Sequence, residues 1–295
     1  MKWMKGMVLL LVANILIMVT LSLTVPLLIN IVLPMFGVDL RGAVDLSSLV
    51  WALAFGFGGA FISLAFSKQM ARAMLDCYQI TQPKSHAEQM IYGSVQEIAQ
   101  RLKITMPEVW VYEAPDPNAF ATGPSKNNSM VAVSTGLLSN LQEQEVRAVL
   151  AHEMGHVYNG DMFATTVLAG LMNTFVYYIA MWVRRFFAER DQAMLGFGLS
   201  IVIQIVVSIL ASVLICWFSR QREYGADAFS AKVYGKDSMI SALLAIDRWV
   251  SRSQVEYSTQ DALATMKISG NSSGFMHFFA THPPVEARIA ALERL

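Results

Sequence analysis

The sequence predicts a predominantly helical α+β protein that is integral to a membrane, with two transmembrane helical hairpins and a soluble domain that contains a small β-sheet. Two observations support this fold class. The composition is 55% hydrophobic and only 15% charged, which is unusually apolar for a soluble chain of 295 residues. The apolar residues are also gathered into long uncharged runs, which alternate with polar stretches of helical and strand-like periodicity.

Four runs contain no Asp, Glu, Lys or Arg, and they cover residues 7–36, 46–67, 162–183 and 192–219. Each is longer than the roughly 20 residues that a helix needs to cross a hydrocarbon layer, so each is a transmembrane candidate. Neighbouring runs pair into two hairpins. A cleavable signal peptide is a weaker interpretation of the first run, because that run is long and lacks a small-residue cleavage site at its end.

Positively charged residues orient the first hairpin. Lys2 and Lys5 precede it, and Lys68 and Arg72 follow it. By the positive-inside rule, the N-terminus and everything after about residue 67 face the cytoplasm. The connection 184–191 would then lie outside with three bases against two acids, so the second hairpin either tolerates this charge or enters the membrane without crossing it fully.

The chain therefore divides into a transmembrane hairpin (1–70), a cytoplasmic segment (71–161), a second hydrophobic hairpin (162–219) and a second cytoplasmic segment (220–295). The lipid bilayer is the partner that this arrangement implies directly. The formal net charge is zero, with 22 acidic and 22 basic residues, so the sequence gives no indication of a nucleic-acid partner.

The first cytoplasmic segment combines helical and strand-like patterns. Apolar residues at helical spacing predict a surface helix over 85–103. Two pieces rich in β-branched and aromatic residues, 108–112 and 130–134, predict strands, and 118–122 is able to form another. The economical interpretation is a small mixed sheet, followed by mainly helical structure after Leu141.

The helix expected after Leu141 carries an HExxH motif that contains His152, Glu153 and His156. Residues four apart lie on one face of a helix, so the two imidazoles can share one Zn²⁺, while Glu153 lies one step round, beside the attacking water. This set of residues is suited to peptide-bond hydrolysis. HExxH also occurs by chance, and the alternative is two ordinary polar histidines on a helix.

A zinc site of this kind needs a third protein ligand, and Glu223 is the best candidate. Glu223 and Asp227 are four residues apart, so on a helix Glu223 can bind the metal while Asp227 accepts a hydrogen bond from a ligand imidazole. The hydrophobic hairpin between His156 and Glu223 leaves and returns at one membrane face, which brings its two ends together. The alternative is a solvated acid pair beside Arg220 and Arg222.

With these residues the chain resembles the HtpX family of membrane-bound zinc metalloproteases, relatives of the CAAX prenyl proteases, over essentially its whole length. The motifs that carry the resemblance are HExxH at 152–156, Glu223 with Asp227, Asn118-Ala119-Phe120-Ala121, and Thr281-His282-Pro283-Pro284 with Arg288. The resemblance implies a zincin-like catalytic domain on the cytoplasmic face of a bacterial inner membrane. It also implies a gluzincin-like endopeptidase of stress response and protein quality control, which cleaves misfolded or damaged membrane proteins and unfolded polypeptides.

The resemblance also assigns roles to further residues. It places Asn118, Ala119, Phe120 and Ala121 along the substrate cleft, where an extended substrate could pair with an edge strand. It brings His282 near the scissile carbonyl as a stabiliser of the oxyanion. Without the family, Asn118 is a turn residue and His282 is a surface histidine before two prolines.

The expected cofactor is one Zn²⁺ per chain, held by His152, His156 and Glu223, although Co²⁺ or Mn²⁺ would also suit such donors. Zinc lowers the pKa of water from about 15.7 toward about 7. Glu153 takes the released proton and later returns a proton to the leaving amine.

Three other functions compete with this one. In an intramembrane protease the motif lies within a transmembrane helix, but Gln142, Glu143 and Arg147 just before it make that burial costly. A non-catalytic metal-binding membrane chaperone or scaffold would have a closed site, usually rich in cysteine, whereas three ligands and a spare glutamate leave a place for water. Prenyl-protein processing needs a larger membrane chamber, which four hydrophobic runs are too few to build.

Overall fold

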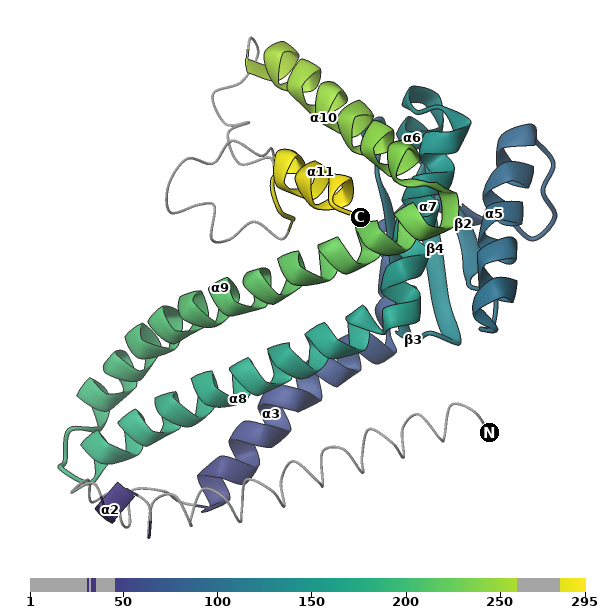
Figure 1. The fold of residues 1–295 in the computed structure, drawn as a ribbon. Coiled ribbons are helices and arrows are strands. Elements are labelled where there is room, and N and C mark those ends of the chain that lie inside the picture. The colour runs from purple at the N-terminus through teal and green to yellow at the C-terminus, as the bar shows by residue number, and fades with distance from the viewer. Residues whose placement is uncertain (1–30, 32, 36–45, 259–281) are drawn as a thin grey trace. The chain divides into compact units, whose positions relative to one another are not determined.

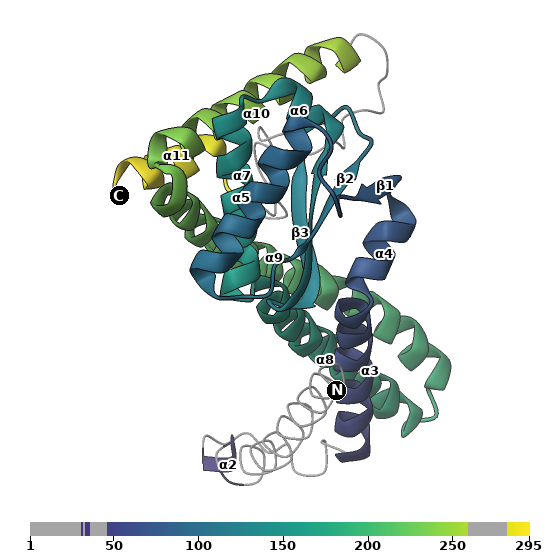
Figure 2. The ribbon, with the colours of Figure 1, turned by 90° about the vertical axis from the view of Figure 1, so that its right-hand side faces the viewer.

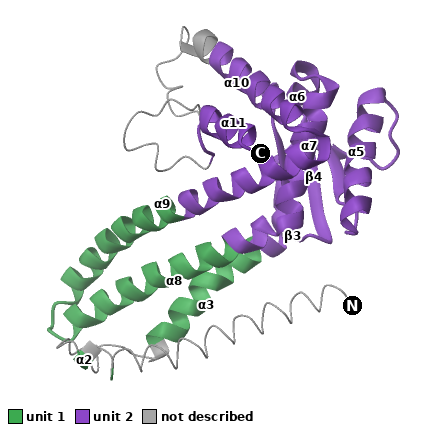
Figure 3. Ribbon diagram, in the orientation of Figure 1, with its two compact units in different colours: residues 1–63, 166–214 green, residues 64–165, 215–295 purple. Residues whose placement is uncertain are grey.

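The computed structural model describes residues 31, 33–35, 46–258 and 282–295. The chain forms two compact units, which Figure 3 distinguishes by colour. One unit comprises 1–63 and 166–214, and the other comprises 64–165 and 215–295. The first hydrophobic run, 7–36, lies outside the described residues except for residue 31 and the short helix α2 (Leu33–Met35).

The first unit is built from apolar helices. Its described part draws on α3 (Leu46–Ala65), α8 (Asp161–Ala188) and α9 (Ala193–Tyr234), each of which is long and apolar enough to cross a membrane. Only 11% of the most apolar window of α9 is buried inside the protein, so its side chains need an apolar environment outside it. Three of the four predicted runs therefore lie in helices of membrane-spanning length, while their pairing into hairpins and their orientation stay predictions.

Two glycines let α3 and α8 approach each other within this unit. A Cβ on Gly56 would lie 2.5 Å from the backbone nitrogen of Thr174, and a Cβ on Gly170 would lie 2.5 Å from Cδ1 of Phe57. Both contacts are far shorter than van der Waals distance, so these positions require glycine. Small residues at such crossings let membrane helices pack closely, which matters because lipid provides no hydrophobic drive for helix association.

The second unit contains a four-stranded sheet. Its strands are β1 (Cys77–Gln79), β2 (Glu108–Tyr112), β3 (Ala119–Ser125) and β4 (Asn128–Ser134). The order is β1-β2-β4-β3, with β2 and β4 parallel and the two outer pairs antiparallel, so β3 is one edge of the described sheet. The predicted small mixed sheet is confirmed. The sequence did not indicate β1, because three residues are too few to show a periodic pattern.

Helices supply most of the core beside this sheet (Figures 1 and 2). They are α5 (His86–Leu102), α6 (Thr135–Asn140), α7 (Glu143–Asn159), α10 (Lys236–Ser258) and α11 (Val285–Glu293), whereas α4 (Ser67–Met74) has no buried residue and packs against β3. The helix that carries HExxH, α7, is the central one, because it packs against α5, α10, β3 and β4. Contacts on so many sides fix its backbone, and with it the direction of every side chain that it presents.

The two long helices end later than the hydrophobic runs that predicted them. α9 continues without a break from its apolar part through Glu223 and Asp227 to Tyr234, and α8 begins at Asp161. Helical backbone is held by hydrogen bonds between nearby peptide groups, which do not depend on whether the side chains are apolar. The predicted boundary at 219 therefore marks a change of composition and not the end of a helix, whereas the boundary at 162 lies one residue from the start of α8.

Candidate metal centre

The helix α7 gives the HExxH motif a rigid support. A capping box between Gln142 and Glu145 closes its first turn, and Gly160, with φ 70°, ends it in the left-handed conformation that favours glycine. The side chain of His152 is buried on the core side of the helix, whereas that of His156 is only partly buried. The motif thus lies at the border between the core and the surface.

Close packing brings α9 against α7. A Cβ on Gly155 would lie 3.2 Å from Cα of Ala226, so the absence of a side chain at Gly155 allows the two helices to approach. The hydroxyl of Ser230 donates a hydrogen bond of 2.7 Å to the carbonyl of Ala148 and fixes the register between the helices. These contacts determine where the acidic residues of α9 lie relative to the two histidines.

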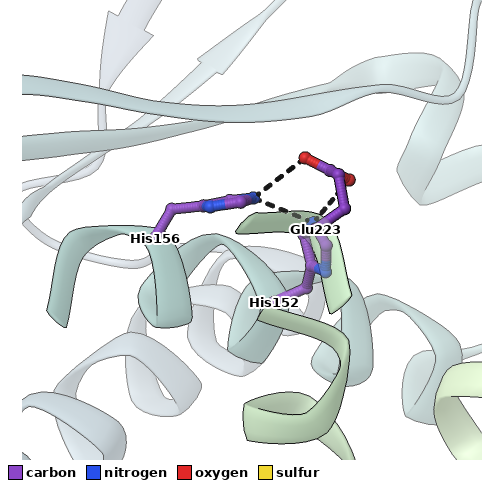
Figure 4. A group of neighbouring side chains, drawn as sticks. All are labelled: His152, His156 and Glu223. Carbon is purple, nitrogen blue, oxygen red and sulfur yellow. Dashed lines mark hydrogen bonds and ion pairs between the residues drawn. The ribbon is translucent and has the colours of Figure 1, made fainter. Parts of the chain in front are cut away.

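Three side chains converge in the space between these helices (Figure 4). The Nε2 atoms of His152 and His156 are 3.1 Å apart. Oε2 of Glu223 lies 3.5 Å from Nε2 of His152, and Oε1 of Glu223 lies 3.4 Å from Nε2 of His156. The structure therefore brings together the two imidazoles and the distant carboxylate that the sequence selects as metal ligands, and their ligand atoms all lie within 4.8 Å of one another.

These donors suit a small divalent cation. Zinc binds imidazole nitrogen at about 2.0–2.1 Å in tetrahedral sites, which places two ligand atoms about 3.3 Å apart. The separations of 3.1, 3.4 and 3.5 Å match that spacing. Glu223 is only 3% exposed, and its carboxylate lies within ion-pair distance of His152, His156, His282 and Arg288, so cationic groups already surround the position that a bound cation would take. Nitrogen and oxygen donors in a three-residue set are typical of catalytic zinc sites.

Asp227 and Arg288 orient the imidazole of His152 through hydrogen bonds. Oδ1 of Asp227 lies 2.9 Å from Nδ1 of His152, so Asp227 occupies the place of the imidazole orienter. Arg288, in α11, donates two hydrogen bonds to Asp227, from Nε at 2.8 Å and from Nη2 at 2.6 Å. Both Asp227 and Arg288 are buried. Helix α11 thus supports the site through Arg288. The family resemblance includes Arg288 but gives it no role.

A second aspartate holds His156, and no motif in the sequence singled it out. Asp161 is the first residue of α8, and its Oδ2 lies 2.7 Å from Nδ1 of His156. Its other oxygen accepts hydrogen bonds from Arg222, which precedes Glu223 in α9. The sequence does contain one signal that could have indicated Asp161. It is an acidic residue that directly follows the glycine at the end of the HExxH helix and directly precedes the uncharged run 162–183.

The surroundings also shift the pKa values of groups in α7. Burial raises the pKa of Glu153, and the Glu223 carboxylate adds to the rise, while His152 and His156 act in the opposite direction. Burial alone would lower the pKa of His156, but hydrogen bonds with Asp161 and Glu223 raise it to about 10. A carboxylate whose pKa is raised toward neutrality is well suited to accept and return a proton.

The remaining predicted residues are His282 and the segment 118–121. Nδ1 of His282 is 2.8 Å from Oε2 of Glu223, and the His282 side chain is 59% exposed, whereas the preceding Thr281 lies outside the described residues. Asn118 directly precedes β3, which packs against α7 and contains Ala119, Phe120 and Ala121. The backbone of Asn118 is tied to Ser134, whose Oγ accepts its N–H at 2.9 Å.

Comparisons with known proteins give a consistent result. The model of peptidase family M48 matches residues 85–295. A protein named Protease HtpX from Idiomarina loihiensis is 41% identical over 296 residues and covers 99% of both chains, and one of the same name from Pasteurella multocida is 41% identical over 286 residues, 96% of this chain and 98% of that one. The crystal structure of Ste24p from S. mikatae covers 96% of this chain and 67% of its own, with a TM-score of 0.62 and 18% identity, a likeness of fold.

Proposed function

The chain belongs to peptidase family M48, and we propose that this membrane-bound metalloprotease is a zinc endopeptidase that cleaves misfolded or damaged membrane proteins at the cytoplasmic face of a bacterial inner membrane. The observation that carries the proposal is the convergence of His152, His156 and Glu223 within 4.8 Å. The resemblance to the HtpX family implies a role in protein quality control and stress response, and the relatives named Protease HtpX support that family. The substrates are membrane proteins and unfolded polypeptides.

Each residue of the centre has a distinct task. His152, His156 and Glu223 hold one zinc ion. When bound, zinc acidifies water and polarises the scissile carbonyl, which is worth several kcal/mol in the transition state. Glu153 accepts the proton of the attacking water and later gives a proton to the leaving amine, a role that its place beside both ligand histidines allows. The exposed His282 donates a hydrogen bond to the developing oxyanion.

The substrate binds in an extended conformation. β3 is an edge of the described sheet and packs against α7, so a polypeptide that adds to this edge would pass close to the HExxH helix. Asn118, Ala119, Phe120 and Ala121 line that edge. The basic residues Lys2, Lys5, Lys68 and Arg72 favour a cytoplasmic position for the catalytic unit.

The test combines metal analysis with hydrolysis. We expect that detergent-purified protein contains one zinc per chain, and that the variant Glu153→Gln keeps the zinc but cleaves casein more than about 100-fold more slowly, because general base catalysis is lost. Glu143→Gln is the matched control, since Glu143 is an exposed glutamate of the same helix whose partner Arg147 also lies on the surface. Casein cleavage by Glu153→Gln at the parent rate would remove Glu153 from this role.

The same experiment separates the main alternative. A non-catalytic metal-binding chaperone or scaffold would bind zinc and unfolded protein without any chelator-sensitive hydrolysis. We expect instead that a zinc chelator abolishes casein cleavage by the parent protein and that added zinc restores it. Parent protein that holds zinc and never cleaves casein would overturn the peptidase proposal and favour the scaffold.

A further inference from the structure

The carboxylate of Asp161 bridges a candidate metal ligand and a guanidinium. Its Oδ2 lies 2.7 Å from Nδ1 of His156, and its Oδ1 accepts hydrogen bonds from Nε of Arg222 at 2.5 Å and from Nη2. Asp161 is buried although it begins one of the helices that are apolar enough to cross a membrane. A buried carboxylate with both oxygens engaged in charge-assisted hydrogen bonds has a fixed orientation.

This orientation determines how His156 presents its other nitrogen. An imidazole that donates its Nδ1 proton to a carboxylate keeps the lone pair of Nε2 free, and the hydrogen bond also fixes the rotation of the ring. In the structure that Nε2 faces His152 and Glu223. The side chain of His156 is more exposed than that of His152, so packing alone constrains its ring less. The contact with Asp161, at 2.7 Å, is therefore a restraint on the ring of His156 that packing does not supply.

The contact between Asp161 and Arg222 also joins two residues that are far apart in the sequence. Asp161 follows Gly160, whose left-handed conformation ends α7, and Arg222 lies 61 residues later in α9. Arg222 directly precedes Glu223, so the residue that holds Asp161 adjoins the third candidate ligand. Successive residues of a helix point about 100° apart. Within one turn of α9, Arg222 therefore points toward Asp161 and Glu223 points toward the imidazoles. This arrangement fixes the carboxylate of Glu223 relative to His156.

We propose that Asp161 and Arg222 are positioning residues of the metal centre, an ion pair that sets the tautomer of His156 and joins the start of α8 to α9 beside Glu223. The inference rests on the proposed function only in that these three side chains bind a metal. It assigns to the ends of the second hydrophobic hairpin a direct part in metal affinity. The integrity of this ion pair would therefore control how tightly zinc is held.

The experiment measures zinc affinity by chelator competition on the purified full-length protein and on Asp161→Asn, Arg222→Gln and Arg222→Lys. We expect Asp161→Asn and Arg222→Gln to bind zinc about 10–100-fold more weakly, the usual effect of losing a partner of a ligand histidine. Arg222→Lys keeps the charge without the planar fork and should recover part of the loss. The visible absorption of Co²⁺-substituted protein should also change, because the geometry at His156 changes.

Arg147→Gln is the matched control. Arg147 also forms an ion pair with a carboxylate and, like Arg222, has a side chain that is 33% exposed, but its partner Glu143 is a surface residue of α7. We expect this variant to keep the zinc affinity and the Co²⁺ spectrum of the parent protein. Equal losses in Arg147→Gln and Arg222→Gln would overturn the proposal, since the effect would then follow from losing any ion pair.

Thermal unfolding of the metal-free variants distinguishes positioning from general stabilisation. The proposal expects metal-free Asp161→Asn to unfold within a few degrees of the parent protein while its zinc affinity falls. Parent-like zinc affinity in Asp161→Asn, or a loss of affinity accompanied by an unfolded metal-free protein, would contradict it. Because zinc affinity is measured without any peptidase assay, a failure of this proposal is distinct from a failure to hydrolyse casein.

Discussion

In its first half α9 leaves Val202, Ile205 and Val206 more than half exposed, whereas in its second half it buries Glu223 and Asp227 almost fully. One continuous helix therefore carries two opposite patterns of burial. Exposed apolar side chains are stable where the surroundings are lipid, and buried carboxylates are stable where cations and hydrogen-bond donors meet them. The difference teaches that the environment of each half, and not the helical backbone, determines what each half does.

The largest effect should come from neutralising the buried acid of the second half. We expect Glu223→Gln to lose bound zinc and to cleave casein about 10²–10³-fold more slowly, because several kcal/mol of transition-state stabilisation disappear with the metal. Zinc content and casein cleavage of the purified variant provide the measurement. Full zinc occupancy in Glu223→Gln would show that the buried acid of α9 has no part in metal binding.

A charge placed in the first half of α9 should disrupt its exposed apolar surface. Val206→Lys puts an ammonium group on the apolar part of α9, and we expect it to destabilise the membrane-inserted protein by about 2.5–3.5 kcal/mol. The fraction of protein in the membrane and the melting temperature in detergent should both fall, while Val206→Leu should leave them unchanged. Val206→Lys that behaved like Val206→Leu would contradict the assignment of this half to lipid.

The support behind His152 should have a smaller effect. Arg288→Gln removes both hydrogen bonds to Asp227, and we expect about 10–100-fold weaker zinc binding, because Asp227 then orients His152 less well. Arg288→Lys should recover little of this loss, since one ammonium group cannot replace the two hydrogen bonds of the guanidinium. Chelator competition measures the affinity, and unaltered binding in Arg288→Gln would exclude Arg288 from the centre.

The smallest effect on stability should come from Glu108, a partly exposed acid that contrasts with the buried Glu223 and Asp227. Burial raises the pKa of Glu108, but hydrogen bonds from Lys68 and Trp110 and the nearby charge of Arg72 together hold it below its ordinary value. A depressed pKa in the folded state stabilises the protein above the unfolded-state pKa of about 4.3, and this contribution is lost as the pH falls through the lower folded-state pKa.

The variant Glu108→Gln tests this sign. We expect it to lower the free energy of unfolding of the metal-free protein by about 1 kcal/mol at pH 7, as is usual for ion pairs near the surface. The difference from the parent protein should shrink as the pH falls below the range in which Glu108 is ionised. Denaturant unfolding at pH 7 and at acid pH gives the comparison, and a difference that stays constant with pH would contradict the assignment.

The sequence predicted those features that depend on local patterns. Alternating β-rich pieces indicated the mixed sheet, and helical spacing indicated that His152 faces the same way as His156 and that Glu223 faces the same way as Asp227. Uncharged length indicated the apolar helices, although most of the first run lies outside the described residues. These patterns repeat over a few residues, and a single sequence displays them directly.

Most of the features that the sequence did not predict arise from tertiary contacts. Asp161 and Arg222 are 61 residues apart, and no spacing rule connects them until α7, α8 and α9 are packed. The change from apolar to polar composition after residue 219 suggested a boundary, but α9 continues to Tyr234 because local hydrogen bonding persists. Arg288 matched the family pattern, yet its role became visible only when α11 placed it on Asp227.

X-ray absorption at the zinc edge of the detergent-purified parent protein tests the central claim most directly, because it reports the atoms that bind the metal and their distances. We predict one zinc per chain with two imidazole nitrogens at about 2.0–2.1 Å and a carboxylate oxygen at about 2.0–2.2 Å. The zinc-edge signal itself should be lost in Glu223→Gln, because that variant is expected to purify without the metal. A protein that purifies without zinc, or a zinc spectrum without two imidazole ligands, would contradict the account.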